Sequence, residues 1–372
     1  MGDALLDRPC DAEGCSQLCT GCNEICKLAV IRQRLMLPEL SIVILVYKTA
    51  HLLRRCLDSL TGQSAYNPSA VEIVIVSDHS PDNADEVVAE YRREHPEIKY
   101  TVRERNGGPA AARNTGLESC TGTYYTYVDS DDCVTPKYLS EILRIIRKHT
   151  PDMLAYRYEI CDETGKSLSV IKAHPPGVCE PSESPVARRL AFKIFAMNLR
   201  CNAVYRRAIV ADLRYREEYK LAEDALFAFE SYLRSKRFYV SNAVLYRYYQ
   251  YSQSATHNFD AKRLADVMSV HGVYLEKIRR QPYFDLVKRD MFYFFASNYL
   301  TWIAAEAARF PLESPVGNAF RSRFGFILQD ARKSGAICPL HAAILQWLTR
   351  TGRYGLLRRC MIVEKVLGVI RG

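Results

Sequence analysis

The sequence predicts an α/β fold, in which a mostly parallel sheet carries helices on both faces and a helical region follows at the C-terminal end. Short apolar runs rich in Ile and Val alternate with segments of helical periodicity, as they do in right-handed βαβ units. Polar residues directly follow three of these runs, at the strand ends where such sheets bind ligands. The 372 residues are enough for two domains, or for one large domain with an appendage.

Four apolar runs predict strands, at residues 40–47, 71–76, 98–103 and 124–128. The first, LSIVILVY, is continuously apolar, which is typical of a strand buried on both faces. Between the runs, the spacing of apolar residues predicts helices over 51–60, 84–91 and 110–119. Because the carboxyl ends of parallel strands lie at one edge of a sheet, we expect the polar strand ends to meet in one crevice.

Three carboxylates, Asp129, Asp131 and Asp132, end the fourth strand within four residues. A buried strand end cannot hold this much negative charge without a cation that compensates it. Oxygen ligands suit Mg²⁺ or Mn²⁺, and these ions commonly bind together with a phosphate. The alternative is an acidic turn that caps a helix beginning near Pro136. The polar ends of the neighbouring strands favour the metal site.

Three segments occur in an order that is similar to that of a known family: LSIVILVYKTAHLLRRCLDSL, EIVIVSDHSPDNADEVV and NGGPAAARNTGLESCTGTYYTYVDSDDCVTPKYL. They resemble the N-terminal half of family 2 glycosyltransferases with the GT-A fold, densely over 40–143 and more loosely to about Ser254. The resemblance implies an inverting bacterial enzyme that moves a sugar from a nucleotide-diphosphate sugar to a glycan or lipid-linked acceptor in cell-surface polysaccharide synthesis. It also implies a Mn²⁺ or Mg²⁺ cofactor, which would stabilise the diphosphate leaving group.

On the nucleotide side, the resemblance implies that Tyr47 lies near the base, that Asp78 contacts the base and that Arg113 faces the nucleotide. For Arg113, the alternative is a salt bridge to a neighbouring acid. The family's first two strands usually end in Pro-x-Tyr-Asn and Asp-Asp-Gly-Ser, whereas here they end in Leu45-Val46-Tyr47-Lys48 and Ser77-Asp78-His79-Ser80. These departures leave the identity of the nucleobase open and do not affect the predicted fold.

The acidic end of the fourth strand, Asp129-Ser130-Asp131-Asp132, matches the metal motif of the family, known as DxD. In that motif the outer acids coordinate the ion and touch the donor sugar. The resemblance therefore implies Asp129, Asp131 and Asp132 as metal ligands, with Asp129 and Asp131 also contacting the donor.

An inverting displacement also needs a base that takes the proton of the acceptor hydroxyl. Glu223 and Asp224 precede a helical run of apolar residues, so they lie in the first turn of a helix, where carboxylates are favoured by the macrodipole. Taken alone, this position indicates a helix cap. The resemblance implies instead that Asp224 is the catalytic base and Glu223 its partner. Further along, Tyr246, Tyr248, Tyr249 and Tyr251 could stack on a sugar or simply pack at a sheet edge.

We expect the chain to divide into a Cys-rich segment over 1–37, a domain over 38–255 that the resemblance implies is a glycosyltransferase, and a helical region over 256–372. The first segment holds five cysteines: Cys10, Cys15, Cys19, Cys22 and Cys26. Clustered thiols of this kind can hold zinc or an iron–sulfur cluster, or they can be unpaired thiols of a poorly ordered terminus. The sequence leaves both interpretations open.

The last segment, 341–372, holds six basic residues against one acid, interleaved with apolar residues. This pattern predicts either contact with an anionic membrane surface or helices that pack on the catalytic domain and expose a basic face. The longest apolar runs are too short to span a bilayer, and no signal peptide opens the chain. We therefore expect a cytoplasmic protein, with contact at the inner face of the membrane as an open possibility.

Other functional classes fit the sequence less well. A nucleotidyltransferase should carry a Gly-rich basic loop after the first strand, and Tyr47-Lys48-Thr49-Ala50 is not such a loop. A non-catalytic nucleotide- or glycan-binding protein of the same fold would not need both acidic motifs. The net charge of +9 is compatible with nucleic acid, but the basic residues belong to no nucleic-acid-binding module.

Overall fold

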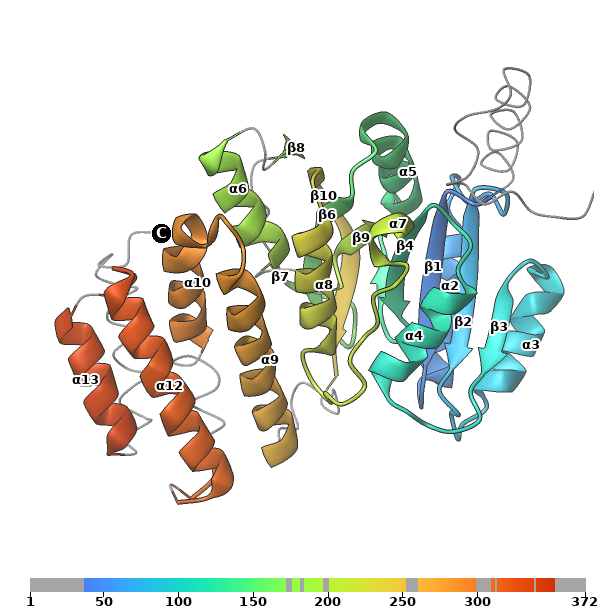
Figure 1. Cartoon of the computed structure of the whole chain (residues 1–372). Coiled ribbons are helices and arrows are strands. Elements are labelled where there is room, and N and C mark those ends of the chain that lie inside the picture. Colours follow the sequence, from blue (N-terminus) through green and yellow to red (C-terminus); the bar gives the residue numbers. More distant parts are fainter. Residues whose placement is uncertain are drawn as a thin grey trace, which may run out of the picture.

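The computed structural model describes residues 37–171, 176–180, 184–196, 201–251, 260–298, 309–311, 313–337 and 339–351, without the side chains of Ser297 and His341. The five clustered cysteines and residues 352–372 of the basic tail therefore lie outside the described residues. The described chain forms a mixed sheet with helices on both sides, followed by further helices (Figure 1). This confirms the predicted α/β class and the helical C-terminal region.

One half of the sheet is parallel. Its strands lie in the spatial order β3 (Lys99–Val102), β2 (Val71–Ser77), β1 (Leu40–Val46) and β4 (Tyr124–Asp129). All seven side chains of β2 and six of the seven of β1 are buried, because helices cover both faces of these central strands. The four strands match the four predicted from apolar runs to within two residues at each end.

The other half of the sheet contains both parallel and antiparallel strand pairs. β9 (Ala203–Arg206) lies antiparallel between β4 and β6 (Met153–Asp162), and β10 (Phe238–Gln250) runs parallel to β6. Three short strands pair antiparallel at the margin: β5 (Cys133–Val134), β7 (Ser167–Val170) and β8 (Gly177–Cys179). The antiparallel strand β9 thus joins the parallel half of the sheet to a second pair of parallel strands.

The order of the strands fixes where the helices lie. The chain moves outward from β1 to β2 to β3, and then returns to the other side of β1 as β4. Because such crossovers are right-handed, α2 (Ala50–Thr61) and α3 (Ala84–Glu94) cover one face and α4 (Pro109–Ser119) covers the other. The reversal makes the carboxyl ends of β1 and β4 a topological switch point, where ligands bind in sheets of this type.

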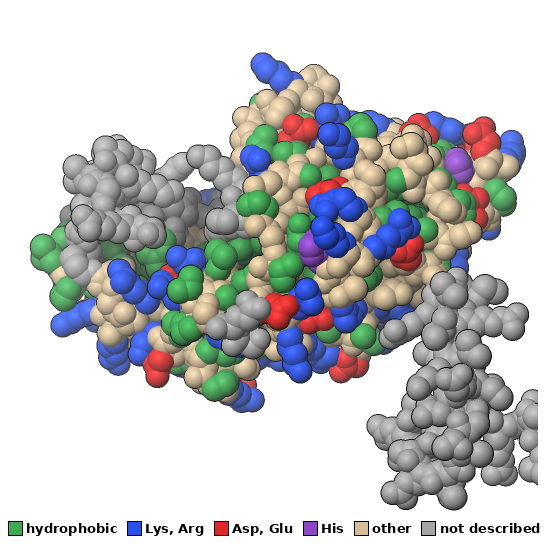
Figure 2. Space-filling view, turned by 90° about the horizontal axis from the view of Figure 1, so that it is seen from above, with side chains coloured by type: hydrophobic (Ala, Val, Ile, Leu, Met, Phe, Trp, Pro, Cys, Tyr) green, Lys and Arg blue, Asp and Glu red, His purple; other side chains and the backbone are tan. Residues whose placement is uncertain are grey.

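The remaining helices follow the parallel half of the sheet. α5 (Tyr138–His149), α6 (Pro185–Ala191), the π-helix η1 (Phe192–Ala196), α7 (Arg207–Val210) and α8 (Glu223–Arg234) lie against the sheet. The C-terminal region contains α9 (Ala261–Arg279), α10 (Phe284–Asn298), α12 (Pro315–Lys333) and α13 (Pro339–Arg350), at the left in Figure 1. Figure 2 shows apolar and basic side chains interspersed at that end of the molecule. Among the described helices, none has both the length and the apolar character needed to cross a bilayer.

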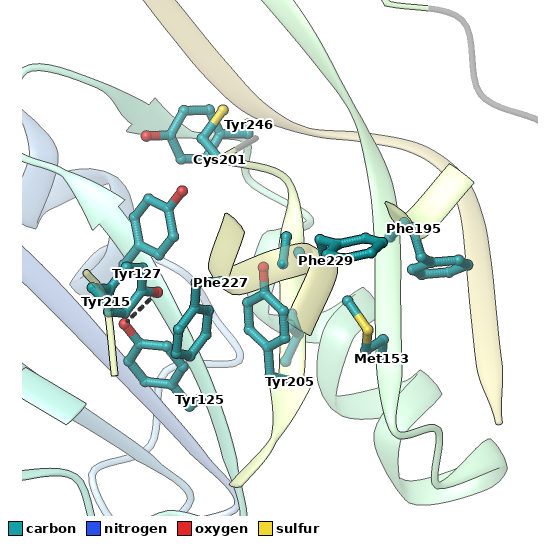
Figure 3. Close-up of a cluster of buried hydrophobic side chains, with 14 of the residues drawn as sticks. Tyr125, Tyr127, Met153, Phe195, Cys201, Tyr205, Tyr215, Phe227, Phe229 and Tyr246 are labelled. Carbon is teal, nitrogen blue, oxygen red and sulfur yellow. Dashed lines mark hydrogen bonds between the residues drawn. The ribbon is translucent and has the colours of Figure 1, made fainter. Parts of the chain in front are cut away.

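A cluster of buried aromatic rings packs α8 against β4 (Figure 3). Phe227 of α8 stacks on Tyr215 with ring centroids 3.9 Å apart, and the Tyr215 hydroxyl lies 3.1 Å from that of Tyr125 in β4. Tyr205 of β9 meets the edge of Phe227 at 5.5 Å. Large buried rings in such contacts stabilise a core strongly, so this cluster fixes the position of the first turn of α8 relative to the end of β4.

Close packing of α4 on β1 gives a first prediction. A methyl group added at Gly116 would lie 2.3 Å from Cγ1 of Val43 in the central strand. We expect Gly116→Ala to lower the free energy of unfolding by about 1–3 kcal/mol, because the core cannot accommodate the extra atom. Gly325→Ala in α12 is the control, since an added methyl there meets no atom within 4 Å and should raise stability slightly. Equal stabilities of the two variants in urea denaturation would contradict this packing.

Candidate active site

The acidic loop after β4 is held in place by neighbours on three sides. Arg55 of α2 donates to the backbone carbonyl of Asp131 at 2.7 Å, and Ser130 shares a hydrogen bond of 2.6 Å with Thr49. The Tyr246 hydroxyl donates to Oδ2 of Asp132 at 2.7 Å, and the backbone N–H of Tyr249 donates to Oδ1 at 2.8 Å. These contacts fix the loop, because they tie it both to the N-terminal part of α2 and to β10.

The three acids of this loop have different surroundings. The Asp129 side chain is 30% exposed, and Asp131 is also partly exposed. Asp132 is only 1% exposed, and both of its carboxylate oxygens accept hydrogen bonds from β10. The structure therefore brings Asp129 and Asp131 to the surface of the loop and encloses Asp132. The assignment of all three as metal ligands remains a prediction.

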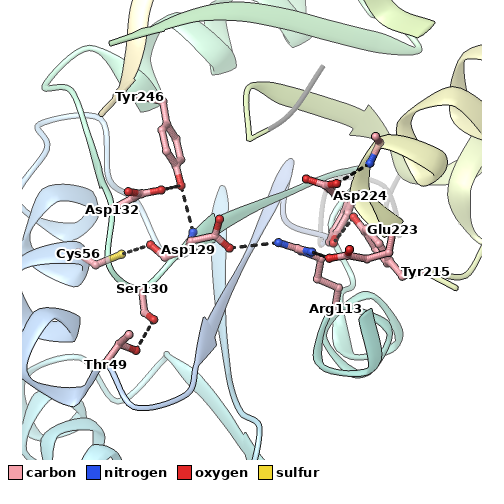
Figure 4. Close-up of polar contacts among 12 residues, drawn as sticks. Thr49, Cys56, Arg113, Asp129, Ser130, Asp132, Tyr215, Glu223, Asp224 and Tyr246 are labelled. Carbon is pink, nitrogen blue, oxygen red and sulfur yellow. Dashed lines mark hydrogen bonds and ion pairs between the residues drawn. The ribbon is translucent and has the colours of Figure 1, made fainter. Parts of the chain in front are cut away.

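A buried arginine joins the two acidic motifs (Figure 4). Arg113 of α4 donates to Oε1 of Glu223 at 2.7 Å and to Oδ1 of Asp129 at 3.3 Å. Its guanidinium lies 4.3 Å from the ring centroid of Tyr127, in an orientation that favours a cation–π contact. Arg113 is 6% exposed, so these contacts fill its surroundings. The structure thus agrees with the salt-bridge alternative for Arg113, and its contact with a nucleotide remains a prediction.

Glu223 and Asp224 differ in exposure, as the acids of the loop do. Glu223 is 5% exposed and pairs with Arg113. Asp224 is partly exposed, and its Oδ1 accepts from the backbone N–H of Ala225 at 2.7 Å. Figure 4 shows Asp224 beside Glu223, across Arg113 from Asp129. Of the two acids, Asp224 is the one whose carboxylate can meet a substrate.

The accumulated charge raises the pKa values of these carboxyls. Burial and the charge of Asp129 raise the pKa of Asp131 to about 6. Burial and the charge of Asp224 raise the pKa of Glu223 to about 7, although Arg113 opposes this shift. Burial raises the pKa of Asp129, and Asp224 adds to the effect while Arg113 again opposes it. One buried arginine therefore does not neutralise the negative charge of this edge of the sheet.

Two acids of the loop present donors that suit a divalent ion. Asp129 and Asp131 offer partly exposed carboxylate oxygens in a region of excess negative charge, which is the chemistry that Mg²⁺ and Mn²⁺ require. In the part of the chain that the structure describes, no group of three His, Cys, Asp or Glu side chains is arranged to hold a metal ion. The carboxylates fit an ion that takes its other ligands from a substrate, as Mg²⁺ does when it binds phosphates.

On the nucleotide side, Asp78 is 3% exposed at the end of β2. Its carboxylate accepts from the backbone N–H groups of Gly107 at 3.0 Å and Gly108 at 2.7 Å, and it pairs with Arg103. Asp78 therefore holds the loop that leads into α4. Tyr47, at the end of β1, is 42% exposed, so its ring is accessible to a ligand. The structure places both residues at the carboxyl edge of the sheet, beside the acidic loop.

Two residues that differ from the family motifs have a strained backbone conformation. Lys48 after β1 has φ 59° and His79 after β2 has φ 54°, in the left-handed region. The family usually carries Asn and Gly at these positions, which adopt this conformation at lower cost than Lys or His. Backbone of this kind is maintained by its surroundings, and here it lies at both strand ends next to the candidate site.

Sequence patterns did not identify several residues that support the site. Arg55 lies on the polar side of α2, and its bond to the Asp131 carbonyl has no sequence signature. Asn114 exchanges hydrogen bonds of 2.8 and 2.9 Å with the backbone of Tyr215, about 100 residues away, and so ties α4 to the chain that leads to α8. Only the position of Asn114 next to Arg113 could have drawn attention to it. Tyr246, one of the proposed sugar-stacking residues, is fully buried and bonds to Asp132 instead.

The family model described as glycosyl transferase family 2 matches residues 41–214. Over residues 41–214, this match confirms the resemblance that the motifs indicate. It covers the acidic loop, Arg113 and the nucleotide side, and it ends before Glu223 and Asp224.

Curated relatives carry the same kind of domain. The glycosyltransferase GlyA of Streptococcus pneumoniae serotype 4 is 29% identical over 216 residues, which are 56% of this chain and 30% of GlyA. The poly(ribitol-phosphate) beta-N-acetylglucosaminyltransferase TarS of Staphylococcus aureus (strain Mu50) is 28% identical over 213 residues, 56% of this chain and 35% of TarS. EpsJ of Bacillus subtilis (strain 168), an uncharacterized glycosyltransferase, is 25% identical over 223 residues, 59% of this chain and 64% of EpsJ. The chain thus spans less than two thirds of the length of these relatives.

Among solved structures, residues 1–349 of S. aureus TarS in complex with UDP-GlcNAc superpose with a TM-score of 0.67. The two chains are 19% identical, and the match covers 89% of this chain and 92% of the other. At this level of identity, the likeness shows that the two chains share a fold, including helices beyond the family match.

The buried arginine gives a second prediction. Arg113→Met should lower the free energy of unfolding by about 3–5 kcal/mol, because it leaves Glu223 buried without its cation. Combining it with Glu223→Gln should restore part of the loss, which a double-mutant cycle in urea denaturation would measure. Arg280→Met is the control, since Arg280 and Glu276 form an exposed pair and should change stability little. If Arg113→Met lowered the free energy of unfolding no more than Arg280→Met, the salt bridge between Arg113 and Glu223 would be contradicted.

Glu223 gives a third prediction, which concerns pH. Its pKa rises from about 4.5 unfolded to about 7 folded, so the folded protein holds this proton more tightly. Its contribution to stability is then fully present below pH 4.5 and is lost as the pH rises through 7. We expect wild-type stability, measured relative to Glu223→Gln, to fall between pH 5 and pH 8. A difference between the two proteins that is independent of pH would contradict the raised pKa.

Proposed function

We propose that this chain, whose residues 41–214 form a glycosyl transferase family 2 domain, is an inverting glycosyltransferase. It would move a sugar from a nucleotide-diphosphate sugar to a glycan or lipid-linked acceptor in cell-surface polysaccharide synthesis. Similarity to TarS and GlyA supports the reaction class, since both are named for glycosyl transfer. We also propose residues 38–255 as the glycosyltransferase domain and 256–372 as a separate helical region.

The observation that carries the proposal is the convergence of two acidic motifs at the switch point of the sheet. Asp129 and Glu223 both contact Arg113, although Arg113 and Glu223 lie 110 residues apart in the sequence. A glycosyl donor presents a diphosphate on one side of the anomeric carbon, and the acceptor attacks from the other. A metal motif and a base motif at one edge supply the two groups that this displacement needs.

In this proposal, Asp129 and Asp131 hold Mn²⁺ or Mg²⁺ together with the diphosphate, and Asp132 braces the loop or joins them. The ion would neutralise negative charge on the leaving diphosphate as a Lewis acid. Arg113 keeps the Asp129 carboxylate in position through its contact at 3.3 Å. Tyr47, at the end of β1, offers an exposed ring to the base, and Asp78 holds the loop that leads into α4.

Asp224 acts as the base in this proposal. It would accept the proton of the acceptor hydroxyl as the oxygen attacks the anomeric carbon, which breaks the bond to the diphosphate and inverts the configuration. Glu223 cannot readily do this work, because its carboxylate is buried and paired with Arg113. Its role would be to hold Arg113, and so to link the base to the metal motif.

We also propose that the C-terminal helices contact an anionic membrane surface, which would bring the enzyme to lipid-linked acceptors. Leu340, Ile344 and Trp347 are exposed and share one face of α13, and Phe326 of α12 is 65% exposed. Arg321 and Arg350 line the cavity of about 300 Å³ between the two helices. Flotation with anionic vesicles should recover the wild-type protein, and equal recovery with neutral vesicles or of Trp347→Ala would count against this contact.

The metal motif gives a fourth prediction. A panel of nucleotide sugars with Mn²⁺ or Mg²⁺, beginning with UDP sugars, should identify a donor by thermal shift and hydrolysis. Asp131→Asn should then reduce metal-dependent turnover by on the order of 10²-fold, while the protein remains folded. Asp285→Asn, an exposed acid of α10, is the control and should behave as wild type. Full turnover by Asp131→Asn would defeat the metal assignment, and failure of every donor to bind would favour a non-catalytic protein.

The base motif gives a fifth prediction. Asp224→Asn should bind the donor as the wild type does but should transfer the sugar about 10²–10⁴-fold more slowly, because the base is lost. Binding is read by titration with the nucleotide sugar and metal, and transfer by product formation. Glu218→Gln, a nearby exposed acid, is the matched control. Undiminished transfer by Asp224→Asn would remove this residue as the base.

A further inference from the structure

The C-terminal helix α9 contacts the chain segment that carries the proposed base. The segment is 218–225, which ends in the first turn of α8, and neither it nor α9 belongs to the family match. Figure 1 shows α9 alongside α8. A helical region that only filled space would meet this segment through apolar side chains. Instead, α9 meets it through hydrogen bonds to the backbone.

Asp266 makes the central contact. This residue of α9 is 3% exposed, and its Oδ2 accepts from the backbone N–H of Lys220 at 2.7 Å. Its Oδ1 accepts from the Lys262 ammonium at 2.6 Å, and the same ammonium donates to the backbone carbonyl of Glu218 at 3.0 Å. Asp266, which is buried, and Lys262, whose side chain is 59% exposed, thus bind two backbone groups of the segment. The bond from the Lys220 N–H matters most, because losing it would leave an oxygen of a buried carboxylate without that donor.

A second contact lies on the other side of the acid pair. The Tyr274 hydroxyl of α9 donates to the backbone carbonyl of Ala225 at 2.6 Å. The ring of Tyr274 stacks on Phe229 with centroids 4.0 Å apart, and Lys277 pairs with Glu230 at 2.9 Å. The contacts of α9 therefore continue along α8 into its second turn. Glu223 and Asp224 lie between the backbone held by Asp266 and the backbone held by Tyr274.

The backbone between these two contacts is strained. Ala222, which precedes α8, has φ 67° and ψ 16°, a left-handed conformation that favours glycine. A non-glycine residue keeps such a conformation only where its surroundings enforce it. The left-handed turn directs the chain into α8 so that Glu223 reaches Arg113. The bond from Lys220 to Asp266 lies two residues before the turn and is placed to enforce it.

We infer that Asp266 is a positioning residue for Glu223 and Asp224, so that α9 sets the geometry of the proposed base. This inference rests on the proposed function. Asp266 would act through the backbone of Lys220 and would not touch donor or acceptor. The helical C-terminal region is then a working part of the active site, and removing its contact should slow transfer without weakening donor binding.

The test compares two buried acids of the helical region. Asp266→Ala removes the contact, and Asp266→Asn keeps an oxygen for the Lys220 N–H while losing the ion pair with Lys262. Asp290→Ala is the matched control: Asp290 in α10 is 8% exposed and pairs with Arg189 at 2.7 Å, far along the chain from the segment 218–225. For each variant, we would measure kcat and donor KM, the melting temperature, and hydrogen exchange of the amides in 217–226.

Asp266→Ala should lower kcat at least ten-fold with donor KM within two-fold of wild type, and it should speed exchange in 217–226. Asp266→Asn should fall between this variant and wild type, and Asp290→Ala should keep wild-type kcat. Unchanged kcat or unchanged exchange in folded Asp266→Ala would overturn the inference. The inference would also be overturned if kcat fell in both Asp266→Ala and Asp290→Ala, in proportion to the decrease in the melting temperature of each variant. If the wild type transferred no sugar, the proposed function would fail. The hydrogen-exchange data would then still decide the structural part, because faster exchange of the amides in 217–226 of Asp266→Ala alone would show that Asp266 holds the segment.

Discussion

The organisation of this protein depends on the balance of charge around one buried guanidinium. Arg113 contacts Asp129 on one side and Glu223 on the other, with the face of Tyr127 beneath it. Two acids in contact with a single arginine, and further acids close by, leave negative charge that burial makes expensive. The raised pKa values of Asp131 and Glu223 follow from this imbalance. A bound cation or a proton must neutralise the remaining negative charge. The proposed metal ion would meet this need.

The fold meets the constraint by bringing distant elements to one edge. β4 delivers the acidic loop to the switch point of the sheet, α4 carries Arg113 across the opposite face, and α8 begins where its first residue, Glu223, reaches that arginine. The aromatic cluster of Tyr125, Tyr215 and Phe227 sets the distance between β4 and α8. The contacts of α9 then fix the chain that enters α8. The packing of the apolar strands and of the aromatic cluster thus determines where the charged residues of the sheet edge lie.

Much of this could be predicted from the sequence. Continuous apolar runs such as LSIVILV define strands buried on both faces, and the predicted strands and helices of the parallel half of the sheet are confirmed. The predicted family resemblance is confirmed over residues 41–214. The partners of single side chains could not be predicted in the same way. The pairing of Arg113 with Glu223 spans 110 residues, and the enclosure of Asp132 by β10 depends on where Tyr246 and Tyr249 fall in the sheet. Local patterns carry no information about such contacts, because tertiary packing decides them. The roles of the individual site residues therefore remain predictions.

In the proposed mechanism, the acids at the end of β4 hold a metal ion together with the diphosphate of a nucleotide, opposite Asp224. The most direct test is anomalous diffraction at the manganese edge from crystals grown with Mn²⁺ and the nucleoside diphosphate of the identified donor. We expect one anomalous peak, with Asp129, Asp131 or both and the diphosphate as ligands, on the same side of Arg113 as Asp129. A diphosphate bound at this edge without manganese, or manganese bound only elsewhere, would contradict it.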